Sequence, residues 1–276
     1  TGYGICSDNV ENPNMKHAEG KDLQAWLDFD ATDGNPIVMR VATSAVDVEG
    51  AKKNLAAELN DFDFDFDALA AKTYQQWNDE LNRIQINTVV NEEDKDIFYT
   101  SLYHCFVVPN LYSDVDGRYR AHDKKVYQSD RPRYTVFSLW DTFRTEHPLL
   151  TLVQRERSID IINTFINNYE TGGLLPVWEL AANETNCMIG YHAIPVIADA
   201  YFCGLEGIDY EKALEAMVKT AREDQFGLSC YKEYGFIPAN CEGESVSKTL
   251  EYAYDDWCIA RLAEALGKKE LADEFY

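Results

Sequence analysis

The chain is organised around one stretch, Ser138 to Asp199, which reads SLWDTFRTEHPLLTLVQRERSIDIINTFINNYETGGLLPVWELAANETNCMIGYHAIPVIAD. It contains two tryptophan–carboxylate pairs, Trp140–Asp141 and Trp178–Glu179, each at a helix start or in a short loop between helical segments. A polar cluster, Asn183–Asn186, precedes a segment that is almost entirely apolar. Carboxylates, indole rings and amides that recur where helices meet loops predict a binding site for a polyhydroxylated ligand.

The helical pattern alternates between two types. Residues 155–170 and 210–222 are amphipathic, with one apolar stripe each. Residues 187–203 are apolar nearly all round, which predicts a helix buried on all sides, and residues 246–266 form another largely apolar helix. Inner helices covered on both faces and outer helices covered on one face predict a double ring of helix hairpins.

The first part of the chain has a different pattern. Residues 22–29 and 37–42 alternate or run apolar between Gly, Pro and Asn, as strands do, whereas residues 48–59 and 66–84 have helical periodicity. The pattern predicts the last strands of a β-domain in 1–46, helices in 47–84, and part of a helical domain in 85–276; the family resemblance described below implies that the strands belong to a β-sandwich and that the helices of 47–84 are linker helices.

Charge and composition limit the partners. The formal net charge of −23 argues against nucleic acid or an anionic membrane surface. No run of about 18 apolar residues exists, so no membrane span is predicted. Seven cysteines without a C-x-x-C pair indicate neither a zinc site nor a disulfide framework, although Cys230 and Cys241 flank a loop and could pair.

Two acidic segments resemble calcium-binding loops. Asp61–Asp67 alternates Asp and Phe but lacks the Gly and terminal Glu of such a loop, which favours acids placed at a helix N-terminus. Asp114–Gly117 begins like a metal loop, but no Glu follows at the twelfth position. A turn within a hairpin spanning Asn110–Arg120 is therefore favoured.

Each candidate site residue also has a structural interpretation. Asp141 and Arg144 are three residues apart, so on a helix they could form an ion pair instead of lining a pocket. Trp178 could fill a gap between helices instead of stacking on a sugar ring. Asn183 and Glu184 fit loop or N-cap residues that face a cleft, or oxygen donors to a hard cation.

A second polar group lies on the apolar helices. His192 falls in the predicted buried helix, where a lone histidine is more often a satisfied core residue, but its closeness to Glu184 keeps it a candidate. Glu251 and Asp255 share a helix face that carries no basic residue. Because buried acids need hydrogen bonds or a cation, this pair predicts either caps for neighbouring helices or a functional cleft.

Four long segments carry a family resemblance. FSLWDTFRTEHPLLTL (137–152), LLPVWELAANETNCMIGYHAIPVIADAY (174–201) and TLEYAYDDWCIA (249–260) resemble glycoside hydrolase family 92, the calcium-dependent exo-acting α-mannosidases. YHCFVVPNLYSDVDGRYR (103–120) is similar to the stretch that precedes them in that family. The resemblance implies a mainly α fold: the first half of an (α/α)6 barrel, preceded by the last strands of a β-sandwich.

The resemblance also implies an activity, inverting hydrolysis of terminal α-linked mannose in N-glycans or mannans with the help of Ca2+. Asp141 and Trp178 match positions that contact the terminal mannose. The neighbouring residues of those motifs, assigned to the same pocket, are Trp140, Arg144, Glu179, Asn183 and Glu184.

Inversion requires a general acid and a general base about 6.5–9.5 Å apart. The family's acid and base motifs do not occur up to Tyr276. We therefore expect no catalytic residue and no activity in this chain alone, with the remainder of the same polypeptide as its partner. The alternative is a non-catalytic carbohydrate-binding or scaffold fragment. Family members are usually bacterial and exported, which implies a periplasmic, cell-surface or secreted protein.

Overall fold

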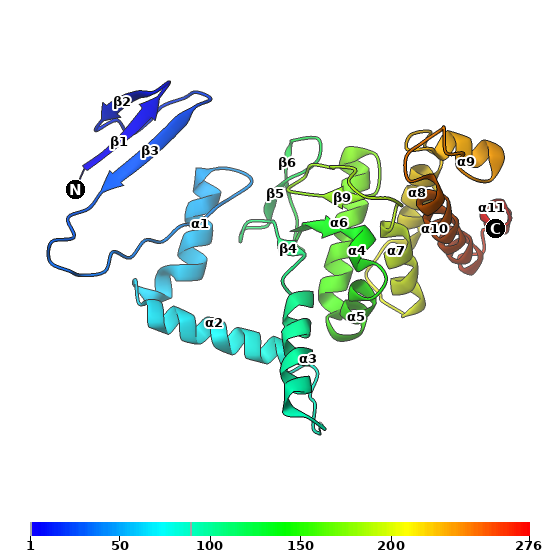
Figure 1. The fold of residues 1–276 in the computed structure, drawn as a ribbon, viewed down its shortest axis with the longest axis horizontal. Helices are drawn as coiled ribbons and strands as arrows, with labels where there is room; N and C mark the ends of the chain where they lie inside the picture. The colour runs from blue at the N-terminus through cyan, green and yellow to red at the C-terminus, as the bar shows by residue number, and fades with distance from the viewer. Residues whose placement is uncertain (1, 89) are drawn as a thin grey trace.

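The structure, a computed structural model, describes residues 2–88 and 90–276 and is mainly α (Figure 1). The first part has β1 (Gly2–Ser7), β2 (Val10–Pro13), β3 (Leu23–Asp28), α1 (Val48–Leu59), the 3-10 helix η1 (Asn60–Phe62), α2 (Phe66–Leu81) and α3 (Glu92–Cys105). The middle has β4 (Asn110–Leu111), β5 (Arg118–Arg120), β6 (Val126–Gln128), β7 (Tyr134–Thr135), β8 (Phe137–Ser138), α4 (Leu139–Thr142), α5 (Glu146–Val153), α6 (Arg155–Gly172) and β9 (Trp178–Glu179). The last part has α7 (Ala193–Phe202), α8 (Tyr210–Ala221), α9 (Leu228–Tyr234), α10 (Ser245–Ala265) and α11 (Lys269–Phe275).

The N-terminal strands form a small antiparallel sheet in the order β2-β1-β3. It lies at one end of the molecule, and a long irregular segment joins it to α1 (Figure 1). The predicted strand at 22–29 is confirmed as β3, but the one at 37–42 is wrong. No described strand pairs with it, and Met39 and Val41 are 68% and 67% exposed. Its apolar alternation therefore has no sheet to join.

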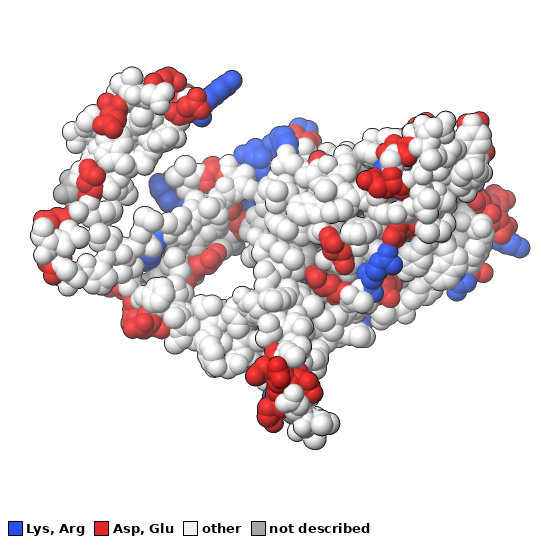
Figure 2. Space-filling view, viewed as in Figure 1, with Lys and Arg blue, Asp and Glu red and all other residues white. Residues whose placement is uncertain are grey.

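Several helices begin at a residue whose side chain caps the helix N-terminus. The Asn91 side chain accepts a hydrogen bond from the Glu93 amide at the start of α3, where acidic residues gather at the helix N-terminus (Figure 2). Asp65 caps α2 in the same way, which confirms the helix-start interpretation of the DFDFDFD segment. Asp209 caps α8, which lies in the predicted amphipathic segment 210–222. These starts are local, so the sequence alone specifies them.

The core lies among α6, α7, α8 and α10, which pack side by side. Each large apolar side chain that is fully buried contributes about 1.5–3 kcal/mol of stability. The completely or almost completely buried members include Ile162, Phe165, Ile194, Ile197, Met217, Ile259 and Leu262. The predicted alternation of helix faces brings these residues together.

The predicted helix at 187–203 is wrong in its first turn and a half, because α7 begins only at Ala193. A helix that started at 187 would need an N–H at residue 195 to bond the carbonyl of Tyr191, and Pro195 has none. Pro195 instead lies in the first turn of α7, where an N–H is not needed. Gly190, with φ +82°, turns the preceding chain away. The predicted burial on all sides holds over residues 193–198, which are all buried, and fails at the C-terminal end of α7, where Phe202 is 53% exposed.

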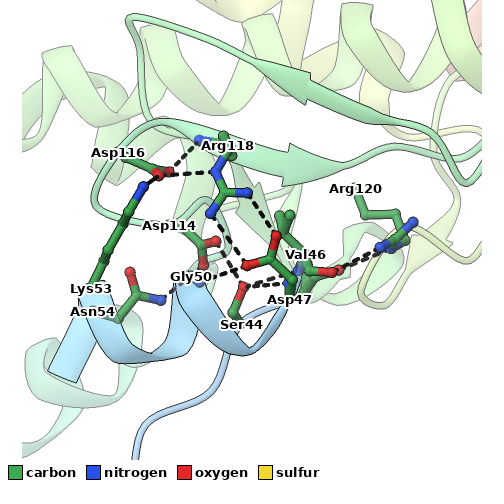
Figure 3. A network of polar contacts seen from close by, with 11 residues as sticks. Ser44, Val46, Asp47, Gly50, Lys53, Asn54, Asp114, Asp116, Arg118 and Arg120 are labelled. Carbon is green, nitrogen blue, oxygen red and sulfur yellow. Dashed lines mark hydrogen bonds and ion pairs between the residues drawn. The ribbon is translucent and has the colours of Figure 1, made fainter.

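The predicted hairpin at 110–120 is also wrong. The turn forms, since the Gly117 amide donates to the Asp114 carbonyl at 2.8 Å, but β4 pairs with β7 and β5 pairs with β6. The turn is instead fastened to α1 and the segment before it (Figure 3). The Asp114 carboxylate accepts from Ser44 Oγ and Asn54 Nδ2, at 2.7 and 2.8 Å.

Asp116, the next acidic residue of that turn, also pairs with basic side chains. Asp116 pairs with Lys53 at 2.8 Å and with Arg118 at 2.9 Å, and these partners hold the pKa of its carboxyl at about 2 (Figure 3). Arg118 also reaches Asp47, the N-cap of α1. Protein donors therefore occupy the carboxylates of the supposed metal loop, and the turn is structural.

Candidate sugar-binding site

The pairing of β8 with β9 joins the two tryptophan–carboxylate pairs. Ser138 lies opposite Trp178, and Phe137 lies opposite Glu179. Ser138 is also the residue before α4, and its hydroxyl donates a short hydrogen bond to the carboxylate of Asp141. Segments 40 residues apart thus meet in this two-stranded ladder. The half-buried Trp178 belongs to β9, and Asp141 belongs to α4, which directly follows β8. Asp141 is exposed, and its second oxygen accepts nothing from the described residues.

Glu179 lies beneath this ladder and is 2% exposed. Its carboxylate accepts hydrogen bonds from Thr135 Oγ1 at 2.9 Å and from the Ala182 amide at 2.5 Å. Burial raises the pKa of the Glu179 carboxyl to about 7. Ala181 and Ala182 have φ values of +48° and +57°, a conformation that costs non-glycine residues of order 1–3 kcal/mol each. Bonds from both Ala amides to Glu179 and Thr135 hold this strained turn.

Glu184 closes the same loop. Its two oxygens accept the backbone amides of Val177, Trp178 and Asn186 at 2.9, 2.9 and 2.7 Å. Asn183 is held by Lys124, whose Nζ lies 2.6 Å from the Asn183 Oδ1. Both side chains were candidates for a cleft wall or for cation ligands. In this geometry they are committed to the loop, and Glu184 fixes the backbone that carries Trp178.

Arg144 does not pair with Asp141. The helix that would have aligned them, α4, ends at Thr142, so the i,i+3 geometry is not formed. Arg144 instead lies 2.6 Å from Glu251 of α10. The ion-pair alternative for these two residues is therefore wrong, and Asp141 is left available to a ligand.

Trp140 lines a cavity of about 600 Å³ beside the ladder. Its buried indole Nε1 has no hydrogen-bond partner among the described residues. Across the cavity, Lys248 pairs with Glu242 at 2.6 Å. A disulfide joins Cys230 to the neighbouring Cys241, which settles the pairing that the sequence left open. The other residues that line this cavity of about 600 Å³ include Val177, Asn186, Cys187, Met188, Ile189, Gly190, Phe226, Glu244, Ser247 and Tyr252.

Two residues near the site carried no signal in the sequence. Glu146 has its carboxyl pKa raised to about 7 by burial and by the negative charge of Asp141. Thr135, which bonds Glu179, comes from a separate strand. Only their tertiary neighbours identify them. A raised carboxyl pKa is typical of functional sites.

Metal ligands do not gather in this part of the chain. Across residues 2–88 and 90–276, no group of three or more His, Cys, Asp or Glu side chains is placed to hold a metal ion. Within the same ranges, no helix is long and apolar enough to cross a membrane.

An exposed carboxylate and an indole on a rigid ladder, beside a cavity with another indole, are the groups that bind sugars. A family model described as the glycosyl hydrolase family 92 catalytic domain matches residues 50–276. Over these residues the chain therefore matches a class of glycoside hydrolase catalytic domains. It belongs to glycosyl hydrolase family 92, as the sequence resemblance indicated.

Solved structures of this family share the fold. The α-mannosidase BT3965 from Bacteroides thetaiotaomicron is 37% identical, with a TM-score of 0.85, over 100% of this chain and 38% of that one. The inverting mannosidase BT2199 from Bacteroides thetaiotaomicron VPI-5482 is 30% identical, with a TM-score of 0.82, over 100% of this chain and 38% of that one. The predicted mainly α fold with preceding strands is confirmed, and it is consistent with the first half of a helical barrel.

A curated protein is similar at lower identity. The "Uncharacterized secreted glycosidase" of Arthroderma benhamiae is 25% identical over 265 residues, which are 88% of this chain and 30% of that protein. The chain spans about two fifths or less of the length of each relative described here.

Proposed function

We propose that this chain supplies the mannose-binding part of an exo-acting, inverting α-mannosidase. The observation that carries the proposal is the β8–β9 ladder: Ser138 lies opposite Trp178, and its hydroxyl bonds the exposed carboxylate of Asp141, whose other oxygen accepts nothing from the described residues. Membership of family 92 and the fold shared with two α-mannosidases support the substrate class.

The groups of the site have separate tasks. An indole such as Trp178 stacks on the apolar C–H face of a pyranose ring. The Asp141 carboxylate accepts hydrogen bonds from two neighbouring hydroxyls at once, and the Ser138 hydroxyl holds it in orientation. Trp140 and the cavity of about 600 Å³ beside it give room for the rest of the glycan. Glu179 and Glu184 keep the Trp178 loop rigid.

The bond-breaking groups are proposed to come from the remainder of the same polypeptide. Among the residues assigned here, Asp141 binds the sugar and Glu179 is buried away from it. An inverting site requires a second carboxyl group and a water on the opposite face of the ring. The predicted division at residues 46 and 84 is part of this proposal, because it places 85–276 as the barrel segment that faces that remainder.

A calcium requirement is also part of the proposal. Ca2+ prefers six to eight oxygen ligands, and no group of three or more His, Cys, Asp or Glu side chains among the described residues is placed to hold an ion. We therefore assign most of its ligands to the remainder of the polypeptide and derive no step through the ion. Mannose release that survives exhaustive chelation would contradict a calcium requirement.

The binding assignment has a direct test with the isolated chain. We expect methyl α-mannoside to bind and the Asp141→Asn variant to bind it roughly 10- to 150-fold more weakly, as expected for losing hydrogen bonds to a charged group of about 1.5–3 kcal/mol. Calorimetry measures both, with Asp209→Asn, a helix cap far along the chain, as a matched control. Equal affinity of the wild-type and Asp141→Asn chains would refute the assignment.

The activity assignment has its own test. The isolated chain should release no mannose from α-mannosides, whereas the natural polypeptide that contains it should. Release by the isolated chain would refute our placement of the acid and base. Binding without release by either polypeptide would favour the non-catalytic carbohydrate-binding alternative.

We also propose an extracellular or periplasmic location. The described name of the similar Arthroderma protein includes the word "secreted". The Cys230–Cys241 disulfide fits an oxidising compartment. Fractionation of the source cells would test it, and recovery in the cytosolic fraction would contradict it.

A further inference from the structure

A line of four ionisable side chains runs from the interior to the candidate site. Asp255 on α10 and His192 at the start of α7 are both 0% exposed. Asp255 Oδ1 lies 2.8 Å from His192 Nδ1, and His192 Nε2 lies 3.4 Å from Glu251 Oε2. The other oxygen of Glu251 lies 2.6 Å from Arg144, just beyond α4. The line joins α10 and α7 to the segment that carries Trp140 and Asp141.

The buried end of this line is held in one geometry. The second oxygen of Asp255 accepts the Tyr191 amide at 2.9 Å, so both its oxygens are occupied. Burial raises the pKa of the Asp255 carboxyl. The Asp255 contact at Nδ1 sets the ring so that Nε2 lies on the side of Glu251, 3.4 Å from its Oε2 and without a hydrogen-bond partner among the described residues. A buried carboxylate held at this distance fixes the angle of the histidine ring.

His192 touches the site segment a second time through its ring face. The imidazole stacks on Phe143, with centroids 3.9 Å apart and planes 12° from parallel. Phe143 and Arg144 directly follow α4. His192 thus contacts one of them directly and the other through Glu251. Two contacts of different kinds on adjacent residues restrain both the position and the direction of the chain there.

The segment needs such a restraint. Helix α4 has four residues, and no side chain caps its N-terminus. Helices this short are not stable by themselves, so packing must impose their geometry. The Ser138–Asp141 hydrogen bond lies inside the segment and cannot place it relative to the other helices. The buried Leu139 anchors the start of the segment, and the contacts of Phe143 and Arg144 tie its C-terminal end to α7 and α10.

We propose that His192 is a positioning residue, which holds the α4 turn so that Trp140 and Asp141 face the sugar. The inference rests on the proposed sugar-binding function for its consequence, but the positioning itself can be measured separately. It also gives a role to Glu251 and Asp255: they hold and orient His192 and Arg144 instead of capping a helix.

Two amide substitutions divide the contacts of His192. In His192→Asn the amide lies near the place of Nδ1 and keeps the Asp255 contact, whereas in His192→Gln it reaches toward Glu251. The matched control is His147→Gln, which removes another buried imidazole, at 3% exposure, that contacts Phe165 instead of Phe143. Glu251→Gln is the milder variant, because its side chain is partly exposed and folding should survive.

Two readouts decide the proposal. The first is the indole N–H signal of Trp140 in an NMR spectrum of the chain, which the Trp140→Phe variant assigns. We expect this signal to shift or broaden in both His192 variants and in Glu251→Gln. In His147→Gln it should keep its wild-type position. The second is affinity for methyl α-mannoside, which we expect to fall about tenfold in the His192 variants, or about 1.4 kcal/mol. Thermal unfolding of each variant identifies any that fails to fold.

The outcomes separate the two ideas. If the wild-type chain does not bind the mannoside, the proposed function fails, and the Trp140 signal still decides the positioning. If the folded His192 and Glu251 variants keep both the signal and the affinity of the wild type, the positioning role is refuted. An equal loss in His147→Gln would also overturn it, because the effect would then be general destabilisation.

Discussion

Glu179→Gln tests the physical account of the loop that carries Trp178. In the folded chain the Glu179 carboxyl is almost wholly buried and accepts hydrogen bonds from Thr135 and Ala182. Burial raises its pKa from the ordinary 4.5 to about 7. Glutamine has nearly the same shape, can still accept a hydrogen bond through its carbonyl oxygen, and does not ionise. The substitution therefore removes mainly the charge.

The sign and the size of the expected change in the free energy of unfolding follow from the linkage between proton binding and folding. Between 4.5 and about 7 the folded protein keeps a proton that the unfolded chain has lost, so the free energy of unfolding falls as the pH rises through this window. The stabilising contribution is fully present below 4.5 and lost above 7. The rise in pKa corresponds to roughly 3 kcal/mol. Relative to the wild type, the Glu179→Gln chain should therefore become more stable by roughly 3 kcal/mol between about pH 4 and about pH 8.

Urea unfolding of both chains, followed by tryptophan fluorescence over this pH range, measures the difference. Glu206→Gln, at an exposed loop position, is the matched control for the exchange of Glu for Gln. Carbon-13 NMR of the Glu179 carboxyl gives its titration directly. A stability difference that does not change with pH, or a carboxyl that titrates at the ordinary value, would refute the reasoning.

Three further outcomes are expected. In Gly50→Ala the new Cβ would lie 2.2 Å from an Asp114 oxygen, so thermal unfolding should show a free energy of unfolding lower by about 1–3 kcal/mol. Ala in place of Gly in a helix usually raises it by about 1 kcal/mol, and such a gain would contradict the packing of α1. Glu184→Gln leaves at least one loop amide without its acceptor, which should speed hydrogen exchange at Trp178 and cost about 1–3 kcal/mol; unchanged exchange would count against it. Replacing both members of the Cys230–Cys241 disulfide by Ser frees a loop of 11 residues and should cost about 3 kcal/mol by chemical unfolding, which reduction of the wild type should reproduce.

The helices that the sequence predicted well have signals contained within one turn. Asp209 at an N-cap and Gly173 in a left-handed C-cap mark where α8 begins and where α6 ends. The errors arose where pairing or packing decides. Residues 37–42 have the pattern of a strand without a partner strand, and the segment before Ala193 is apolar but cannot continue the helix past Pro195.

The candidate site divides in the same way. Trp140, Asp141 and Trp178 stand out as residue types and by family resemblance. Nothing in the sequence shows that Arg144 pairs with Glu251, which is 107 positions away, instead of with Asp141, which is three positions away. That choice depends on where α4 ends and on where α10 packs.

The sequence alone determined the family, the mainly α character and the helix caps, because these depend on long motifs and on neighbours within a few residues. The tertiary structure decided which groups meet: Ser138 with Trp178, Glu184 with three loop amides, and His192 with two carboxylates of α10. Burial of a carboxyl such as that of Glu179, and hence its pKa, depends on residues from other elements that exclude water around it. Such long-range contacts cannot be read from spacing along the chain.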